Sequence, residues 1–262
     1  MYLGVADLAI FKNEIPILEY DDRQEAVIMP THEALHVKLP EKAIFAFLGD
    51  VIDCFAKQEN LEIVAEFISS TKKYPVYIME YKGEEICLCQ APVGSAAAVQ
   101  IMDWLIGYGV KKVISAGCCG ALVELPENMF LVPTRALRDE GASYQYLPPT
   151  RYVDIDPEVL QKIESAMKKM SLPYIECMTW STDGFYRETR DMVAYRKEEG
   201  CMVVEMECAG LAACAKFRRA EFGQILFTAD TLANVDCYDE RDWGGESFEK
   251  ALHICLAVIS EM

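Results

Sequence analysis

The chain has 262 residues, of which 52% are hydrophobic, and its 25 basic and 42 acidic residues give a formal net charge of −17. An acidic surface repels nucleic acids and anionic membranes, so both are excluded as partners. The 11 cysteines are scattered through apolar segments and the first residues lack a signal-peptide pattern, which predicts reduced thiols and a cytoplasmic location.

Strand-like apolar runs alternate with helical segments along most of the chain. Continuous apolar runs predict strands buried on both faces, so we expect a three-layer α/β/α fold with a central mixed, mostly parallel sheet. No linker marks a boundary, and we expect one domain over residues 1–262, with 1–40 as an N-terminal extension that packs on the core or on a neighbouring subunit. In chain order, we expect strands at 43–48, 86–91, 110–116, 129–132, 174–179, 202–204 and 224–228, and helices ending near Gly107 and over 157–170, 207–217 and 247–262.

Three of the predicted strands are followed by glycine turns. These turns contain Gly49, Gly94 and the run Gly117 to Gly120. Ligands of open α/β sheets bind at the carboxyl ends of the strands, and glycine lets the backbone approach an anion closely. Any one such turn is more often only a tight connection, so the turns indicate a binding edge without identifying its ligand.

Carboxylates follow two of the later strands. Glu205, Met206 and Glu207 separate a short apolar strand from a helix of small residues, and Asp230 follows the last predicted strand. A buried carboxylate is costly unless it is paired, and sugar hydroxyls would satisfy the glutamates; capping of the helix N-terminus explains them equally well. Asp230 is interpreted either as a turn residue or as a general acid that protonates a departing base.

A metal-binding motif occurs near the N-terminus. His32, Glu33 and His36 match the H-E-x-x-H pattern of zinc peptidases, in which a helix places both imidazoles on one face. Pro30 and Pro40 leave room only for a short turn. A histidine-containing loop near a subunit interface is the favoured interpretation, a zinc peptidase is a remote alternative, and no metal is expected.

The order of these motifs resembles the hexameric and trimeric-type nucleoside phosphorylases, which include purine nucleoside phosphorylase, uridine phosphorylase and methylthioadenosine nucleosidases. The resemblance covers Lys42 to the C-terminus, and Glu-Met-Glu followed by Cys-Ala-Gly-Leu is its most specific part. It implies cleavage of a nucleoside by phosphate to give a free base and ribose 1-phosphate. It also implies that no cofactor is needed beyond phosphate as co-substrate, and that the protein is a homo-oligomer built from dimers, up to a hexamer.

The resemblance also assigns roles to individual residues. Glu207 resembles the glutamate that holds the ribose hydroxyls, Met206 the methionine beneath the sugar, and Asp230 the acid that protonates a purine. Phe185 resembles the aromatic residue that stacks on the base, and Arg190 is matched less closely to a base-contacting arginine. The other members of the implied site are Glu205, Gly94 and Tyr144 for the substrate and Gly49, Cys118, Gly120 and Lys72 for phosphate.

The chain departs from the family pattern where phosphate is bound. Asp53 and Ser115 stand where two arginines are expected, and Cys118 replaces a serine or threonine. Guanidinium groups are the bidentate donors best suited to phosphate. Charge could come instead from Lys72, Arg138 or Arg187.

Three functions therefore stay open at this point. The resemblance favours phosphorolysis, the missing arginines favour hydrolysis by water as in the nucleosidases, and a nucleoside-binding member without catalysis is a third alternative. A purine is preferred as the base because Asp230 resembles the purine-type acid, while Arg190 and Tyr144 keep uridine open.

Overall fold

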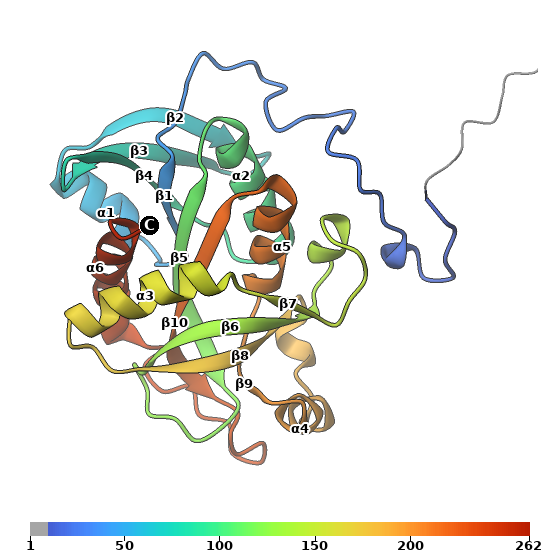
Figure 1. The fold of residues 1–262 in the computed structure, drawn as a ribbon. Helices are drawn as coiled ribbons and strands as arrows, with labels where there is room; N and C mark the ends of the chain where they lie inside the picture. The colour runs from blue at the N-terminus through green and yellow to red at the C-terminus, as the bar shows by residue number, and fades with distance from the viewer. Residues whose placement is uncertain (1–9) are drawn as a thin grey trace, which may run out of the picture.

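A ten-stranded mixed sheet runs through the protein, with helices on both of its faces (Figure 1). The computed structural model describes residues 10–262. The strands are β1 Lys42–Ala46, β2 Glu62–Ile68, β3 Lys73–Tyr81, β4 Glu84–Gln90, β5 Lys112–Ala121, β6 Phe130–Asp139, β7 Tyr152–Asp154, β8 Tyr174–Thr182, β9 Cys201–Glu205 and β10 Glu221–Thr231. The α-helices are α1 Val51–Gln58, α2 Ser95–Gly107, α3 Pro157–Lys169, α4 Arg190–Glu198, α5 Cys208–Arg218 and α6 Phe248–Ile259, and the 3-10 helices are η1 Pro16–Leu18, η2 Ser143–Gln145, η3 Phe185–Arg187 and η4 Gly245–Ser247.

The sheet has two parts that meet at β5. In the first part the order is β2-β3-β4-β1-β5, and β1 is parallel to both β4 and β5. In the second part β5, β10, β6, β8 and β9 pair in that order and β9 pairs with β5 again, so these five strands close a barrel. The predicted mixed sheet between helical layers is confirmed, and the barrel closure is an addition that the sequence pattern did not indicate.

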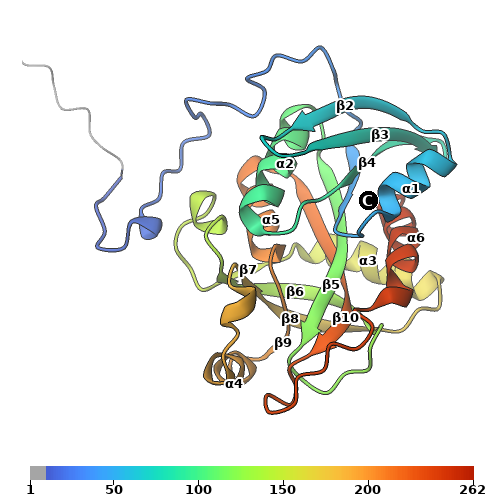
Figure 2. The same cartoon turned by 180° about the vertical axis from the view of Figure 1, so that it is seen from behind.

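Helices α1, α3 and α6 cover one face of the sheet and α2 and α5 the other (Figure 2), and apolar side chains hold them there. On one face, Ile52 of α1, Ile163 of α3 and Ile254 of α6 belong to one buried cluster with strand residues. On the other face, α2 and α5 share a second buried cluster. The two helices approach closely at Gly210, where a Cβ atom would lie 2.8 Å from Ser95 Oγ. Each fully buried aliphatic side chain of this size contributes about 1.5–3 kcal/mol, so both layers are held firmly on the sheet.

The run Gly117 to Gly120 is not the turn that the sequence predicted. It lies inside β5, which pairs with β10 as far as Ala121 and with β9 from Gly120. Barrel closure explains the difference, because both neighbours of β5 continue beyond the end of β1 and extend its hydrogen-bonded ladder. A Cβ atom at Gly120 would lie 3.1 Å from Val204 and 3.2 Å from Asp230 Oδ1, so glycine leaves room for that carboxylate.

Residues 10–38 form an irregular arm whose regular structure is limited to η1. His32 and His36 lie in this arm outside any helix, so the helix that the zinc motif requires is absent from it. The Glu33 carboxylate accepts a hydrogen bond from Trp104 Nε1 at 3.1 Å. Within residues 10–262 no group of three side chains is placed to hold a metal ion, and the remote zinc-peptidase alternative gains no support.

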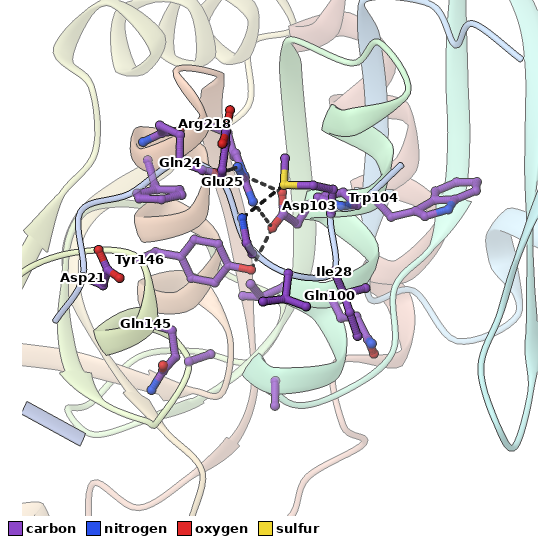
Figure 3. A pocket seen from close by; sticks show the side chains of 18 of the residues that line it. Asp21, Gln24, Glu25, Ile28, Gln100, Asp103, Trp104, Gln145, Tyr146 and Arg218 are labelled. Atoms are coloured by element: carbon purple, nitrogen blue, oxygen red, sulfur yellow. Dashed lines mark hydrogen bonds and ion pairs between the residues drawn. The ribbon is translucent and has the colours of Figure 1, made fainter. Parts of the chain in front are cut away.

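A cavity of about 980 Å³ lies between the arm and residues of α2 and α5. Figure 3 shows Gln24 of the arm beside Arg218 and Asp103. Arg218 binds Asp103 through two hydrogen bonds of 2.7 and 3.0 Å, and the Tyr146 hydroxyl donates to the same carboxylate at 2.9 Å. The ionic groups at the centre of this cavity are therefore already paired. None of the predicted site residues lines this cavity.

Over residues 10–262 no helix is long and apolar enough to cross a membrane.

Candidate active site

A separate cavity of about 430 Å³ lies where β1, β4, β5, β9 and β10 end. It is the place where the strand ends bring together carboxylates, a thioether, an aromatic ring and glycine backbone. Such a concave site with a few converging polar groups is the usual form of a small-molecule site. The predicted residues that line it are Gly49, Cys118, Gly120, Phe185, Glu205, Met206, Glu207 and Asp230.

Glu205 acts as the cap of α5. Its Oε1 accepts hydrogen bonds from Thr179 Oγ1 at 3.1 Å and Ser181 Oγ at 2.6 Å. Its Oε2 accepts from the backbone amides of Glu207 at 2.8 Å and Cys208 at 2.7 Å. A carboxylate has about four acceptor positions, and the protein uses all four, so Glu205 fixes the β9–α5 turn and has little capacity left for a substrate.

Glu207 is the carboxylate that remains available to a ligand. It is 6% exposed, lines the cavity, and its Oε1 accepts a hydrogen bond of 2.6 Å from the Gly94 amide. Gly94 has φ +98°, a conformation that residues with a side chain rarely adopt. Burial, followed by the negative charge of Glu205, raises the pKa of Glu207 to about 8. Its remaining lone pairs can accept hydrogen bonds from a pair of vicinal hydroxyls.

Asp230 faces the same cavity from the end of β10. Its side chain is buried, at 6% exposure, and burial raises its pKa. The Tyr238 hydroxyl donates a hydrogen bond to it, which opposes that rise. A carboxyl group with a raised pKa retains a proton nearer to neutral pH and is suited to act as a general acid. One cavity therefore contains an acceptor for hydroxyl groups and a candidate proton donor.

Comparison with known proteins identifies the family to which the chain belongs. Residues 42–260 match the family model described as the phosphorylase superfamily. The chain belongs to the phosphorylase superfamily. Two curated relatives are a DeoD-type purine nucleoside phosphorylase of Buchnera aphidicola, 26% identical over 82% of this chain and 92% of its own length, and a guanosine phosphorylase of Halorubrum lacusprofundi, 23% identical over 76% and 85%.

Solved structures of similar fold include proteins named for different activities. A uridine phosphorylase of Vibrio fischeri has a TM-score of 0.73 with 21% identity, covering 86% of this chain and 95% of its own. An AMP nucleosidase of Bacteroides thetaiotaomicron has a TM-score of 0.69 with 23% identity, covering 85% and 88%. At these identities the likeness shows the fold, and the reaction of this superfamily member has to be argued from its own residues.

Several predicted binding residues lie outside the cavity of about 430 Å³. Arg190 lines an adjoining cavity and pairs with Asp236 at 2.6 Å, and Lys72 lies over the ring of Tyr74 in the β2–β3 hairpin. The Tyr144 hydroxyl donates to the Arg138 carbonyl oxygen at 2.9 Å, away from the cavity. Of the two arginines considered as other sources of charge, Arg138 is buried and its guanidinium donates to Ser143, Leu147, Pro148 and Thr150. The other, Arg187, is exposed in η3. Within this chain, neither Tyr144 nor Lys72 reaches the site.

Asp53 and Ser115, where the resemblance led us to expect arginines, have other surroundings. Asp53 accepts a hydrogen bond of 3.1 Å from the Tyr77 hydroxyl, and Ser115 is fully buried. Among the described residues, Ser115 Oγ and the Oε1 atoms of Gln90 and Gln224 are buried without a hydrogen-bond partner. Gln90 and Gln224 both line the cavity. Neutral amide oxygens therefore lie in the wall of the cavity where we expected phosphate to bind.

The Cys118 side chain lines the cavity, and its surroundings disfavour the thiolate form. Burial, together with the nearby Glu207 and Asp230, raises the pKa of its thiol to about 11. The thiol is therefore protonated at neutral pH and is a poor nucleophile. It offers a bound ligand only a weak hydrogen-bond donor.

Glu188 and Trp243 were missed by the sequence interpretation. Both line the cavity beside Phe185 and Asp230. Glu188 follows Phe185 by three residues, and burial, with a smaller effect of Asp230, raises its pKa to about 7. The signal that could have found it is a carboxylate within the segment already linked to base binding. Trp243 carried no such signal because the connection after β10 determines its position.

The raised pKa of Glu207 predicts a pH-dependent change in stability. A carboxyl group whose pKa is raised in the folded state stabilises that state fully below its unfolded value of 4.5, and this contribution is lost as the pH rises through about 8. Glutamine is neutral throughout this range. At pH 9 the substitution removes a buried negative charge, and we expect Glu207→Gln to raise Tm by roughly 2–4 °C for each ~1 kcal/mol regained in the free energy of unfolding. At pH 5 we expect little change in Tm. Thermal scans of both proteins at the two pH values measure this, and an equal Tm difference at both would contradict it.

Proposed function

We propose that the protein cleaves the N-glycosidic bond of a purine nucleoside, with water as the nucleophile. Glu207 binds the ribose hydroxyls, Met206 packs beneath the sugar, and Phe185 stacks on the base. The proposal takes the bond type from membership of the superfamily, and the preference for a purine from Asp230 and from the purine-type relatives. The choice of nucleophile rests on the charge of the cavity.

The reaction develops opposite charges on the two halves of the substrate. The sugar becomes positive as the bond to the base lengthens, and the carboxylates around the cavity stabilise this oxocarbenium-like state. Asp230 gives its proton to a nitrogen of the departing base, which leaves as a neutral molecule. The oxygen of water forms the new bond to the anomeric carbon, and the proton that it releases passes to a carboxylate of the cavity.

The observation that carries the hydrolytic proposal is the absence of a cation from the described lining. Within residues 10–262 no lysine, arginine or histidine lines the cavity, whereas Glu188, Glu205, Glu207 and Asp230 do. A phosphate dianion there would have none of the guanidinium groups that normally hold it, and whichever of these carboxyl groups is ionised would repel it. Water is neutral and can donate hydrogen bonds to the unpaired oxygens of Gln90 and Gln224.

Phosphorolysis is the second candidate, because both curated relatives described above are named phosphorylases. In that reaction phosphate would be the co-substrate, and a neighbouring copy of the chain would supply the cation that this cavity lacks. A homo-oligomer built from dimers, as the family resemblance implies, would be required for it.

Product analysis with and without phosphate separates the two reactions. We expect the protein to release free ribose from inosine or adenosine at a rate that changes less than 2-fold between phosphate-free buffer and roughly 50 mM phosphate. Formation of ribose 1-phosphate, with activity lost when phosphate is removed, would contradict hydrolysis and establish phosphorolysis. If the protein binds nucleosides but cleaves no member of a purine and pyrimidine panel, both catalytic proposals fail and the binding alternative stands.

A further inference from the structure

A second cavity adjoins the candidate active site on the side of the base. It has a volume of about 530 Å³, and it shares the side chains of Phe185, Glu188, Asp230 and Trp243 with the catalytic cavity. Ligand pockets generally span about 300–1,000 Å³, so the catalytic cavity of about 430 Å³ has the size to hold a nucleoside by itself. The additional space beyond Asp230 is therefore not needed for a simple nucleoside.

The lining of this second cavity suits a flat apolar group. Aromatic rings of Tyr186, Tyr238 and Trp243 surround it, and Val193, Leu232 and Val235 supply aliphatic surface. Tyr238 is 53% exposed and Trp243 is 44% exposed, so large apolar surfaces remain open to a ligand. Asn234 and Glu240 also line this cavity, and its aromatic and aliphatic walls favour a hydrophobic ring. The cation in the lining, Arg190, is paired with Asp236 at 2.6 Å.

Glu188 lies at the junction between the two cavities. Its side chain is half-buried and faces both spaces, beside the carboxyl group proposed to protonate the base. A carboxyl group in this position can accept a hydrogen bond from an N–H group on the edge of a purine. The N–H of a substituted exocyclic amine provides that donor, and the substituent attached to it would extend past Glu188.

We propose that the second cavity is a subsite for a substituent on the exocyclic amino group of the base, so that N-substituted aminopurine nucleosides are the preferred substrates. This inference rests on the proposed nucleoside cleavage. The substituent is an aromatic or aliphatic ring joined to the base through an N–H group. Glu188, at the junction of the two cavities, accepts a hydrogen bond from that N–H.

Comparison of adenosine with N6-benzyladenosine tests the subsite. We expect kcat/KM for N6-benzyladenosine to be at least 10-fold higher, because its ring is removed from water on binding. Val235 lines the second cavity and not the catalytic one, and Val235→Trp would place a bulky ring in the space proposed for the substituent. This variant should lose at least 10-fold on N6-benzyladenosine and stay within 3-fold of the unchanged protein on adenosine. Val235→Ala is the matched control and should retain the preference for the substituted nucleoside.

Two outcomes would overturn the subsite: adenosine cleaved as fast as or faster than N6-benzyladenosine, or equal losses on both substrates in Val235→Trp. Failure of the proposed function is recognised separately, because the protein would then cleave neither nucleoside. In that case calorimetric binding of N6-benzyladenine and adenine decides the subsite alone. Binding of the benzyl compound at least 10-fold more tightly, lost in Val235→Trp, supports it, and equal binding of the two bases refutes it.

Discussion

Glutamine in place of Glu207 is expected to lower kcat/KM for a purine nucleoside by about 10²–10⁴-fold. The carboxylate is buried and accepts a hydrogen bond of 2.6 Å from the Gly94 amide. Of the two glutamates in the β9–α5 turn, Glu207 is the one whose oxygens can still accept hydrogen bonds from a ligand. Hydroxyl donors from the ribose favour the ionised form of Glu207 when the substrate binds. A hydrogen bond to a charged group contributes about 1.5–3 kcal/mol, and two ribose hydroxyls would lose this on substitution. The amide keeps the size of the side chain, so the fold should be retained.

Steady-state kinetics and a thermal scan of the same samples measure the effect of Glu207→Gln. Glu124→Gln is the matched control, because Glu124 is an exposed glutamate outside the cavity, and its kcat/KM should stay within 2-fold of the unchanged protein. If Glu207→Gln keeps its fold and retains kcat/KM within 3-fold, Glu207 does not hold the sugar.

Asn in place of Asp230 should reduce kcat for purine nucleosides by about 10²–10⁴-fold, the usual contribution of a positioned general acid. The loss should depend on the leaving group. p-Nitrophenyl riboside releases a phenolate that leaves without a proton, so we expect its cleavage to fall by less than 10-fold. Parallel assays of the two substrates measure the difference.

Equal losses on both substrates would show that Asp230 supports the site without donating a proton to the base. Asp236→Asn is the matched control because Asp236 lies in the connection after β10 and pairs with Arg190 on the surface. Its activity on both substrates should stay near that of the unchanged protein.

Much of the fold could be predicted because short-range patterns determine it. The runs at 43–48 and 86–91 are apolar on both faces, and they form β1 and β4 of the central sheet. The closed barrel could not be predicted in this way, since it depends on pairing between β5 and β9, which are distant in sequence. Pairing of residues 117–119 with β10 and of Gly120 with β9 also made the expected glycine turn part of a strand.

The candidate site was predictable to a similar extent. The position of Glu207 and Asp230 at strand ends follows from the alternation of apolar runs and turns. The division of roles between the two glutamates could not be seen, because it depends on Thr179 and Ser181 of β8, which satisfy Glu205 and leave Glu207 free. Gln90 and Gln224 were likewise not predicted as site residues, since they lie on different strands and only the folded chain brings both to one cavity.

In the proposed reaction, Glu207 and Asp230 act on one nucleoside within one cavity. A purine C-nucleoside, whose carbon–carbon bond between sugar and base is not cleaved, can be crystallised with the protein to locate both halves of the substrate. We expect both ribose hydroxyls within hydrogen-bond distance of the Glu207 carboxylate and a ring nitrogen of the base within hydrogen-bond distance of Asp230. A ligand bound in the 980 Å³ cavity beneath the arm, or one that contacts neither carboxylate, would contradict it.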